Sequence, residues 1–233
     1  MTREPLELVC IGGTLCDDRV FAPMLSQLSY PAQSWHPVHY DRIGNAAKAL
    51  IDVAPHEFVA LGFSLGGFVA LETLRLAPER VRAVVLVSGN AYPDTIGNAP
   101  ARRHDVEEAK AMGLAAFIRT RARMLVADDA VERDDIIQVI ATMAVDLGHT
   151  AHGRQVEANI HRPDFREFLR TAPSPVLAIA GLHDQLCPSE RYFDLENAPS
   201  VRLRMVDTGH FVPLEAPRQC AALIDEFMTG LGT

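Results

Sequence analysis

The segment "ALGFSLGGFVALE", residues 60–72, places a serine where an apolar run gives way to a helical pattern. Ser64 lies two residues after Gly62 and two before Gly66, the spacing of a nucleophilic serine on a sharp turn between a strand and a helix. We expect glycine at both positions because such a turn leaves no room for a Cβ atom. Ser64 would then lie at a helix N-terminus, where developing negative charge is favoured. The segment therefore predicts a nucleophile.

A serine hydroxyl is a poor nucleophile until a base takes its proton, so Ser64 requires a histidine and a carboxylate. Asp184 follows the apolar run "PVLAIAG", and His210 follows the run "VRLRMVD". Because the carboxyl ends of parallel strands meet at one edge of a sheet, we expect the three side chains to converge. We therefore predict Ser64 as nucleophile, His210 as base and Asp184 as the group that orients the imidazole.

Other residues compete for the roles of base and acid. His183 lies beside Asp184, but successive residues point apart, and Asp207 lies only three residues before His210. The remaining histidines fit surface or cap positions better than a catalytic role; they include His36, His39, His149 and His152. We keep His183 and Asp207 as the alternatives.

Attack on a carbonyl also requires hydrogen-bond donors for the oxyanion. One donor is expected from the backbone N–H of Leu65, the residue after the nucleophile. The second is expected from the glycine-rich turn in "CIGGTLCDDRVF", where the Thr14 N–H is the best candidate. Gly12 and Gly13 also allow the chain to turn sharply there, and the two roles are compatible.

The elements that position these residues alternate between strand and helix. Six apolar runs indicate strands, at residues 6–11, 35–40, 57–63, 81–88, 175–181 and 201–207. Helical patterns lie between them at residues 18–29, 44–53, 65–77, 189–197 and 217–229. This alternation predicts a doubly wound α/β fold with a mostly parallel six-stranded sheet.

The alternation stops between Pro93 and Pro173, where the pattern is helical throughout. We interpret residues 93–173 as a helical cap inserted into a core formed by residues 1–92 and 174–233. Leu114, Phe117, Met124, Met143 and Leu147 either line an apolar acyl site or pack the cap onto the core. Polar residues gather near the return to the core: His149, His152, Arg154, Gln155, Asn159 and Arg162. They either recognise a polar group of the substrate or form a solvated helix face.

Composition excludes several classes of protein. The formal net charge of −8 argues against binding of nucleic acid or of an anionic membrane, and no segment approaches the ~20 apolar residues of a membrane span. Four cysteines without paired spacing give no support for a zinc site, and we expect reduced thiols in a cytoplasmic protein. No metal or organic cofactor is implied.

The four segments "GGTLCDDRVF", "GFSLGG", "GLHDQLCP" and "TGHFVPLEAP" together resemble the α/β-hydrolase superfamily, specifically its compact capped esterases and lactonases. The resemblance covers nearly the whole chain and implies the same roles for Ser64, Asp184 and His210, with Thr14 and Leu65 as oxyanion donors. Many relatives have His-Gly in place of Gly12-Gly13. Relatives also often begin with an antiparallel hairpin, for which the five residues before the first expected strand leave no room, so we predict six parallel strands.

We therefore predict a serine hydrolase that cleaves a small carboxylic ester, lactone or thioester through an acyl-enzyme. The same three residues also serve C–C bond hydrolysis or cofactor-free haloperoxidase activity in this superfamily, and a non-catalytic ligand-binding protein is a further alternative. An acidic carrier protein is an alternative partner, because arginines gather at positions 102, 103, 119, 121 and 123. Acidic residues lie between these arginines and argue against such a partner.

Overall fold

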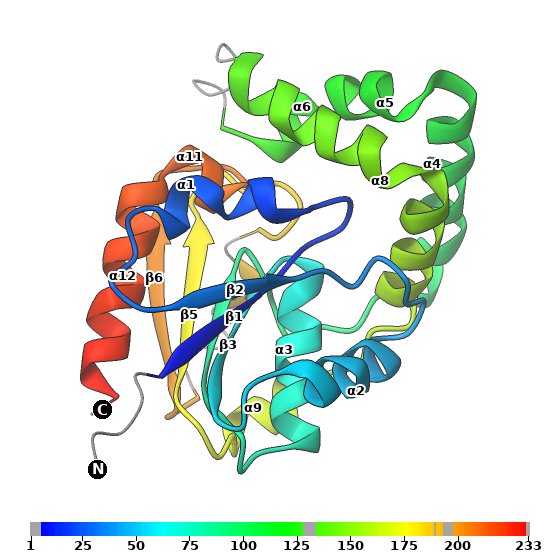
Figure 1. Cartoon of the computed structure of the whole chain (residues 1–233). Helices are drawn as coiled ribbons and strands as arrows, with labels where there is room; N and C mark the ends of the chain where they lie inside the picture. The colour runs from blue at the N-terminus through cyan, green and yellow to red at the C-terminus, as the bar shows by residue number, and fades with distance from the viewer. Residues whose placement is uncertain (1–5, 128–133, 189, 193–197, 232–233) are drawn as a thin grey trace.

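The computed structural model (Figure 1) describes residues 6–127, 134–188, 190–192 and 198–231. Its sheet comprises β1 (Glu7–Ile11), β2 (Ala32–Trp35), β3 (Phe58–Phe63), β4 (Val81–Val87), β5 (Val176–Gly181) and β6 (Val201–Val206). The strand order is β2-β1-β3-β4-β5-β6, and all neighbouring strands pair in parallel. The predicted six-stranded parallel sheet is therefore confirmed.

The second strand was predicted in the wrong place. We expected it at residues 35–40, whereas β2 ends at Trp35, whose carbonyl accepts the N–H of Gly12. Pro37 has no N–H to donate to a ladder and so weakens strand pairing beyond Trp35. The sequence of β2, "AQSW", shows no apolar run because this strand lies at the edge of the sheet and is only partly buried.

The helices of the core are α1 (Ala22–Leu25), α2 (Ile43–Val53), α3 (Leu65–Leu76), α11 (Val212–Glu215) and α12 (Pro217–Gly230), with a short 3-10 helix η1 (Asp18–Val20). The helices predicted before β3, after β3 and at the C-terminus agree with α2, α3 and α12. The helix predicted at residues 18–29 is instead η1 followed by the single turn of α1. The helix predicted at 189–197 lies mostly outside the described residues.

Alternate residues of the central strands face opposite layers, as the period of two requires. Leu61, Val85 and Ile179 pack with α1, α12 and the inserted helices, whereas Ala60 and Val84 pack with α2 and α3. In Figure 1, α1 and α12 accordingly lie on one side of the sheet and α2 and α3 on the other. Both faces of the central strands are thus buried, which explains their continuous apolar sequences.

A helical region is inserted between β4 and β5. It consists of η2 (Ile96–Asn98), α4 (Ala99–Met112), α5 (Leu114–Thr120), α6 (Ala122–Leu125), α8 (Asp134–Ile160) and α9 (Arg166–Arg170). Figure 1 shows α4, α5, α6 and α8 above the ends of the strands. Gly148 has φ +79° and breaks α8 into two parts, of which the second carries the predicted polar group except Arg162, which follows the helix.

Phe165 and Leu169, at the start of α9 and within it, pack in the core layer that contains α3. The division of the chain into a core and a cap at residues 93 and 173 stays a prediction. No helix in the described part of the chain is long and apolar enough to cross a membrane.

Candidate active site

Ser64 lies on the turn between β3 and α3, with a backbone that few residues other than glycine adopt. Its φ is +52° and its ψ is −115°, and it occupies the N-cap position of α3. The Ser64 N–H donates to Val87 O at 2.9 Å, and its carbonyl accepts the N–H of Gly67 at 2.9 Å. Such a conformation costs on the order of 1–3 kcal/mol and is maintained by its surroundings. The turn presents the hydroxyl at the carboxyl edge of the sheet.

The glycines that flank Ser64 are required by space. A Cβ added to Gly62 would lie 2.3 Å from the carbonyl oxygen of Gly66, and one added to Gly66 would lie 2.1 Å from the carbonyl oxygen of Ile11. In both cases the obstructing atoms are backbone, which cannot rotate out of the way. The spatial reason predicted for both glycines is therefore confirmed.

The three side chains expected to converge form a continuous hydrogen-bonded chain. The Oγ of Ser64 lies 3.0 Å from Nε2 of His210, and Nδ1 of His210 lies 2.7 Å from Oδ2 of Asp184. His210 and Asp184 are both buried, with 5% and 4% of their surface exposed. Phe63 and Phe211 contact the imidazole with ring centroids 5.3 and 5.8 Å away. Both ring nitrogens of His210 therefore have a defined partner.

The second oxygen of Asp184 fixes the orientation of the carboxylate. Oδ1 accepts the backbone N–H groups of Leu186 at 2.9 Å and of Cys187 at 2.8 Å. The loop after β5 thus folds around the carboxylate and leaves Oδ2 for His210. Because a carboxylate oxygen can only accept, the His210 Nδ1 atom carries the proton and its Nε2 atom faces Ser64 as an acceptor.

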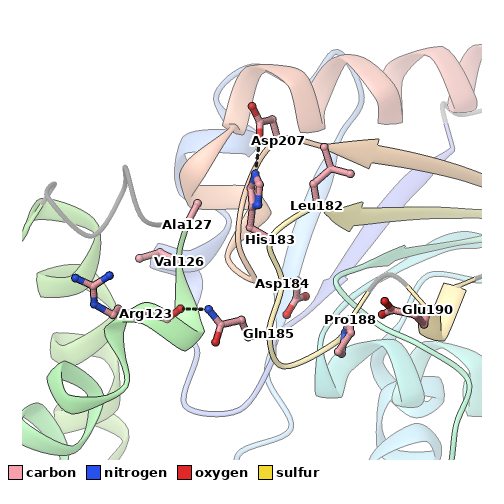
Figure 2. Close-up of a pocket in the computed structure, with 10 residues that line it drawn as sticks. All are labelled: Arg123, Val126, Ala127, Leu182, His183, Asp184, Gln185, Pro188, Glu190 and Asp207. Carbon is pink, nitrogen blue, oxygen red and sulfur yellow. Dashed lines mark hydrogen bonds and ion pairs between the residues drawn. The ribbon is translucent and has the colours of Figure 1, made fainter.

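The two alternative residues contact each other instead. Nε2 of His183 lies 2.7 Å from Oδ1 of Asp207, and both side chains are exposed. Figure 2 shows this pair pointing away from Asp184 at the surface. The structure therefore brings neither His183 nor Asp207 into contact with Ser64.

The backbone amides of Leu65 and Thr14 stay the predicted donors of an anion site beside Ser64. Leu65 is the first residue of α3, so its N–H lacks an intrahelical partner. In the turn after β1, the N–H of Leu15 is occupied, because it donates to Oε1 of Gln155 at 2.8 Å. The Thr14 N–H makes no hydrogen bond to any residue that the structure describes. Thr14 and Leu65 both line the cavity that contains Ser64 and His210.

His36 packs closely against the turn after β1 at Gly12. A Cβ on Gly12 would lie only 2.2 Å from Nδ1 of His36. The other ring nitrogen of His36 lies 2.8 Å from Oδ1 of Asp18. An imidazole from the segment after β2 thus supports this turn, which the sequence did not reveal.

Glu215 holds the loop that carries His210, and sequence analysis did not single it out. Its Oε2 accepts the N–H groups of Ala127 and Gly209, and its Oε1 accepts the N–H of Phe211, each at 2.9 Å. Burial raises the pKa of Glu215, while these three hydrogen bonds act in the opposite direction. The His210 N–H also donates to the carbonyl of Leu125 at 3.0 Å. The end of α6 and the segment after it are therefore joined to the histidine loop.

A cavity of about 270 Å³ lies over Ser64, beneath the inserted helices. Its apolar lining comprises Leu15, Phe63, Leu65, Phe68, Phe117, Ile118, Met124, Leu125, Ile140, Val156, Leu186 and Phe211. Of the five apolar cap residues considered from the sequence, Phe117 and Met124 line the cavity. The other three pack in or against the core: Leu114, Met143 and Leu147.

Polar residues line the cavity as well, and three of them belong to the polar group near the return to the core: His152, Asn159 and Arg162. The sequence left open whether this group faces a substrate or solvent. His152 was expected at the surface or in the cap; it lies in the inserted helical region but is only 4% exposed, and its ring packs against Phe117. Burial lowers the pKa of His152 to about 4, and repulsion from His149 acts in the same direction. His152 is therefore neutral at neutral pH.

The arginines that line the cavity are paired with acids. Arg102 and Arg162 both contact Asp94, whose side chain is 1% exposed, at 2.5 and 3.4 Å. Arg121 contacts Asp105 and Glu108, each at 2.8 Å. Burial lowers the pKa of Arg162 to about 10, which still leaves the guanidinium charged at neutral pH. The cavity thus presents balanced charge and not a cationic surface.

A larger, more open hollow of about 800 Å³ lies on the far side of the acid loop. Figure 2 shows its lining, including Arg123, Gln185, Asp184 and Pro188. The Nε2 of Gln185 donates to the carbonyl of Arg123 at 2.9 Å and so joins the acid loop to α6. Ser64 does not line this hollow, whereas it does line the smaller cavity.

Metal coordination has no candidate in the described ranges, which contain no group of three or more His, Cys, Asp and Glu side chains that could hold an ion. All four cysteines are buried and free. Burial raises the pKa of the Cys187 thiol, which lines the cavity, to about 11, so it is protonated at neutral pH.

Comparison with known proteins gives a consistent result. The sequence profile of the "Alpha/beta hydrolase family" matches residues 15–223. A pimeloyl-[acyl-carrier protein] methyl ester esterase of Aromatoleum aromaticum is 29% identical over 198 residues, which are 79% of each chain.

Two solved structures share the fold at low sequence identity. A thermophilic esterase from Thermogutta terrifontis superposes with a TM-score of 0.88 at 20% identity, over 98% of this chain and 91% of that one. The enol-lactonase from Burkholderia xenovorans LB400 gives a TM-score of 0.85 at 17% identity, over 97% and 92%.

Proposed function

The chain belongs to the α/β hydrolase family and is esterase-like, and on this premise we propose that it is a serine hydrolase that cleaves a small, uncharged carboxylic ester through an acyl-enzyme. The observation that carries the proposal is the chain of hydrogen bonds from Ser64 through His210 to Asp184, in a cavity beneath the inserted helices. A base in contact with a serine hydroxyl, itself oriented by a buried carboxylate, is the arrangement that activates serine for attack on a carbonyl.

In the proposed reaction His210 Nε2 takes the proton of Ser64 as Oγ attacks the ester carbonyl. The N–H groups of Leu65 and Thr14 stabilise the oxyanion, and Asp184 stabilises the imidazolium that forms. His210 then donates its proton to the leaving alkoxide, which departs as an alcohol. A water molecule, deprotonated by His210, then attacks the acyl carbonyl; the bond to Ser64 Oγ breaks, the acid is released, and His210 returns the proton to Ser64 Oγ. Lactones and thioesters undergo the same sequence with a different leaving group.

The cavity indicates the kind of acyl group that fits. Its volume of about 270 Å³ lies just below the usual range for ligand pockets, about 300–1,000 Å³. Phe117, Ile118 and Ile140 provide an apolar wall, while each lining arginine has an acidic partner. An anionic acyl chain would have to displace one of these ion pairs, so we propose a short, uncharged acyl chain.

A second candidate substrate is a methyl ester carried on an acyl carrier protein, because the relative from Aromatoleum aromaticum is named for that activity. A carrier protein is acidic and would require accessible cations near the cavity. Arg103 is paired with Glu157, and Arg119 with Asp134 and Gln138. These pairs reduce the positive charge available to a partner, so we place this substrate second.

The test is to treat the protein with a fluorophosphonate and to measure hydrolysis of p-nitrophenyl esters with acyl chains of two to twelve carbons. We expect stoichiometric labelling that Ser64→Ala abolishes, with fastest turnover of short chains. An acyl-carrier-protein methyl ester is assayed in parallel and should be the poorer substrate. Labelling at another residue, or esterase activity retained by Ser64→Ala, would overturn the proposal.

A further inference from the structure

Gln155 is a fully buried polar residue of the cap that contacts the turn after β1 and no part of the Ser64–His210–Asp184 chain. It lies in the second part of α8 and has no exposed surface. Its Oε1 accepts the N–H of Leu15 at 2.8 Å, across 140 residues of sequence. Only the oxygen of the amide can face an N–H donor, so the contact also fixes which way the amide points.

The backbone that Gln155 contacts is strained. Leu15 has φ +55°, a region that residues with a side chain seldom adopt, and is itself buried. Asn159, one helical turn after Gln155, donates from Nδ2 to Oγ1 of Thr14 at 3.1 Å and to the Gln155 carbonyl at 3.2 Å. Two side chains on one face of α8 therefore hold two consecutive residues of the turn.

This contact decides which amide of the turn is left for the cavity. With the Leu15 N–H directed to Gln155, the Thr14 N–H is the amide that stays without a hydrogen bond among the described residues and lines the cavity. Without the acceptor, the buried Leu15 N–H would be unsatisfied. The turn would then relax toward another conformation and move the Thr14 N–H out of line with the oxyanion.

We propose that Gln155 is a positioning residue that presents the Thr14 amide to the oxyanion, so that the cap forms part of the oxyanion hole. This inference rests on the proposed function. The Nε2 of Gln155 is buried and has no hydrogen-bond partner in the described structure, so only its oxygen serves this role. A side chain of the same length that keeps an acceptor oxygen should therefore replace it.

The test compares Gln155→Met, which keeps the length but has no comparable acceptor, with Gln155→Glu, which keeps an oxygen at the same position. Gln138→Met, on an exposed part of the same helix, is the control for the substitution itself. Removal of one oxyanion donor lowers kcat by about 10²–10³-fold, and misalignment of one should lower it by about 10- to 100-fold. We expect this loss in Gln155→Met with KM changed less than about three-fold, because the contact acts in the transition state.

Binding of an alkyl boronic acid, whose adduct with Ser64 places an oxygen in the oxyanion site, should weaken in parallel with kcat in Gln155→Met. Gln155→Glu should retain kcat within about five-fold. Undiminished kcat in folded Gln155→Met, or an equal loss in Gln155→Glu, would overturn the inference. If Gln155→Met does not fold, Asn159→Ala tests the same contact between α8 and the turn after β1, at a half-buried position. This variant should lower kcat about three- to ten-fold, and an unchanged kcat would count against the inference.

Fluorophosphonate labelling of the wild type separates this inference from the proposed function. A wild-type protein that is not labelled at Ser64 and cleaves no ester overturns the proposed function and this inference with it. A labelled, active wild type alongside a fully active Gln155→Met variant overturns only the role of Gln155.

Discussion

Asp184→Asn should abolish most activity while leaving the fold intact, because the site determines how the new amide must point. Oδ1 of Asp184 accepts two backbone N–H groups, from Leu186 and Cys187. In the variant the amide oxygen must take this place, since an NH₂ group there would face two donors. The NH₂ group then faces Nδ1 of His210, where the carboxylate oxygen lies 2.7 Å away in the wild type.

The consequence is the wrong tautomer of His210. An N–H donor opposite Nδ1 requires a lone pair on that nitrogen, so the proton moves to Nε2, which lies 3.0 Å from Ser64 Oγ. A protonated, neutral Nε2 cannot accept the serine proton. The same substitution in a serine protease triad lowers kcat about 10⁴-fold, equivalent to ~5 kcal/mol of transition-state stabilisation. The hydrogen bonds from the loop are kept, so we expect a loss of stability of no more than about 1–2 kcal/mol.

The assay is steady-state hydrolysis of a short p-nitrophenyl ester, with urea unfolding measured on the same samples. Asp207→Asn is the matched control: Asp207 contacts His183 at the surface, so kcat should stay within about two-fold of the wild type. A loss of less than ten-fold in Asp184→Asn, or a comparable loss in Asp207→Asn, would refute the tautomer argument and return Asp207 to consideration.

Three further predictions concern stability. Gly66→Ala should lower the free energy of unfolding by about 1–3 kcal/mol or more, because its Cβ would lie 2.1 Å from the Ile11 carbonyl oxygen. The control is Gly153→Ala, whose Cβ meets nothing within 4 Å; it should be neutral or stabilising when both variants are unfolded in urea. His152 has a folded pKa of about 4 against an ordinary value of 6.5, so the unfolded chain binds more protons between these values and stability falls as pH drops from about 6.5 to 4. His152→Phe should remove up to about 3 kcal/mol of this loss of stability at low pH. The measurement is urea unfolding of the wild type and the variant at pH 7 and pH 4.5, and an identical pH dependence in the two proteins would contradict the prediction. Glu215→Gln should lower the free energy of unfolding by about 2 kcal/mol and should lower kcat. The two oxygens of Glu215 together accept three backbone N–H groups, and the substitution replaces one of these oxygens with an NH₂ donor. An unchanged thermal midpoint would show that the histidine loop does not depend on Glu215.

The arrangement of Ser64, Asp184 and His210 could be predicted because it depends on topology. Each residue follows an apolar strand, and parallel strands bring their carboxyl ends to one edge. The glycines beside Ser64 were predictable for a similar reason, since a sharp strand-to-helix turn excludes a Cβ wherever it occurs. Both features leave a pattern in the sequence that is independent of the partners that pack around them.

Edges and supporting contacts leave no such pattern. The strand β2 has an exposed side, so its residues need not be apolar. The strand was therefore predicted in the more apolar segment that follows, at residues 35–40. His36 supports the turn at Gly12 through a close approach of two segments 24 residues apart, and the absence of a Cβ at Gly12 is the only trace in the sequence. Glu215 follows His210 by five residues, yet only the folded loop directs three amides toward it.

The inserted helices illustrate most directly why supporting contacts escape sequence analysis. They are hydrogen-bonded to the acid loop, the histidine loop and the turn after β1: α6 accepts from Gln185 through the Arg123 carbonyl and from His210 through the Leu125 carbonyl, and α8 contacts the turn after β1 through Gln155. The first two contacts use backbone carbonyls of the cap, which every residue has, so no residue type marks them and no substitution of a cap side chain removes them. The contact of α8 with the turn after β1 differs, because Gln155 and Asn159 both make it through side chains. Substitution of these two residues can therefore break this contact, and the change in kcat that follows measures how far the inserted helices act in the chemistry as well as in enclosing the substrate.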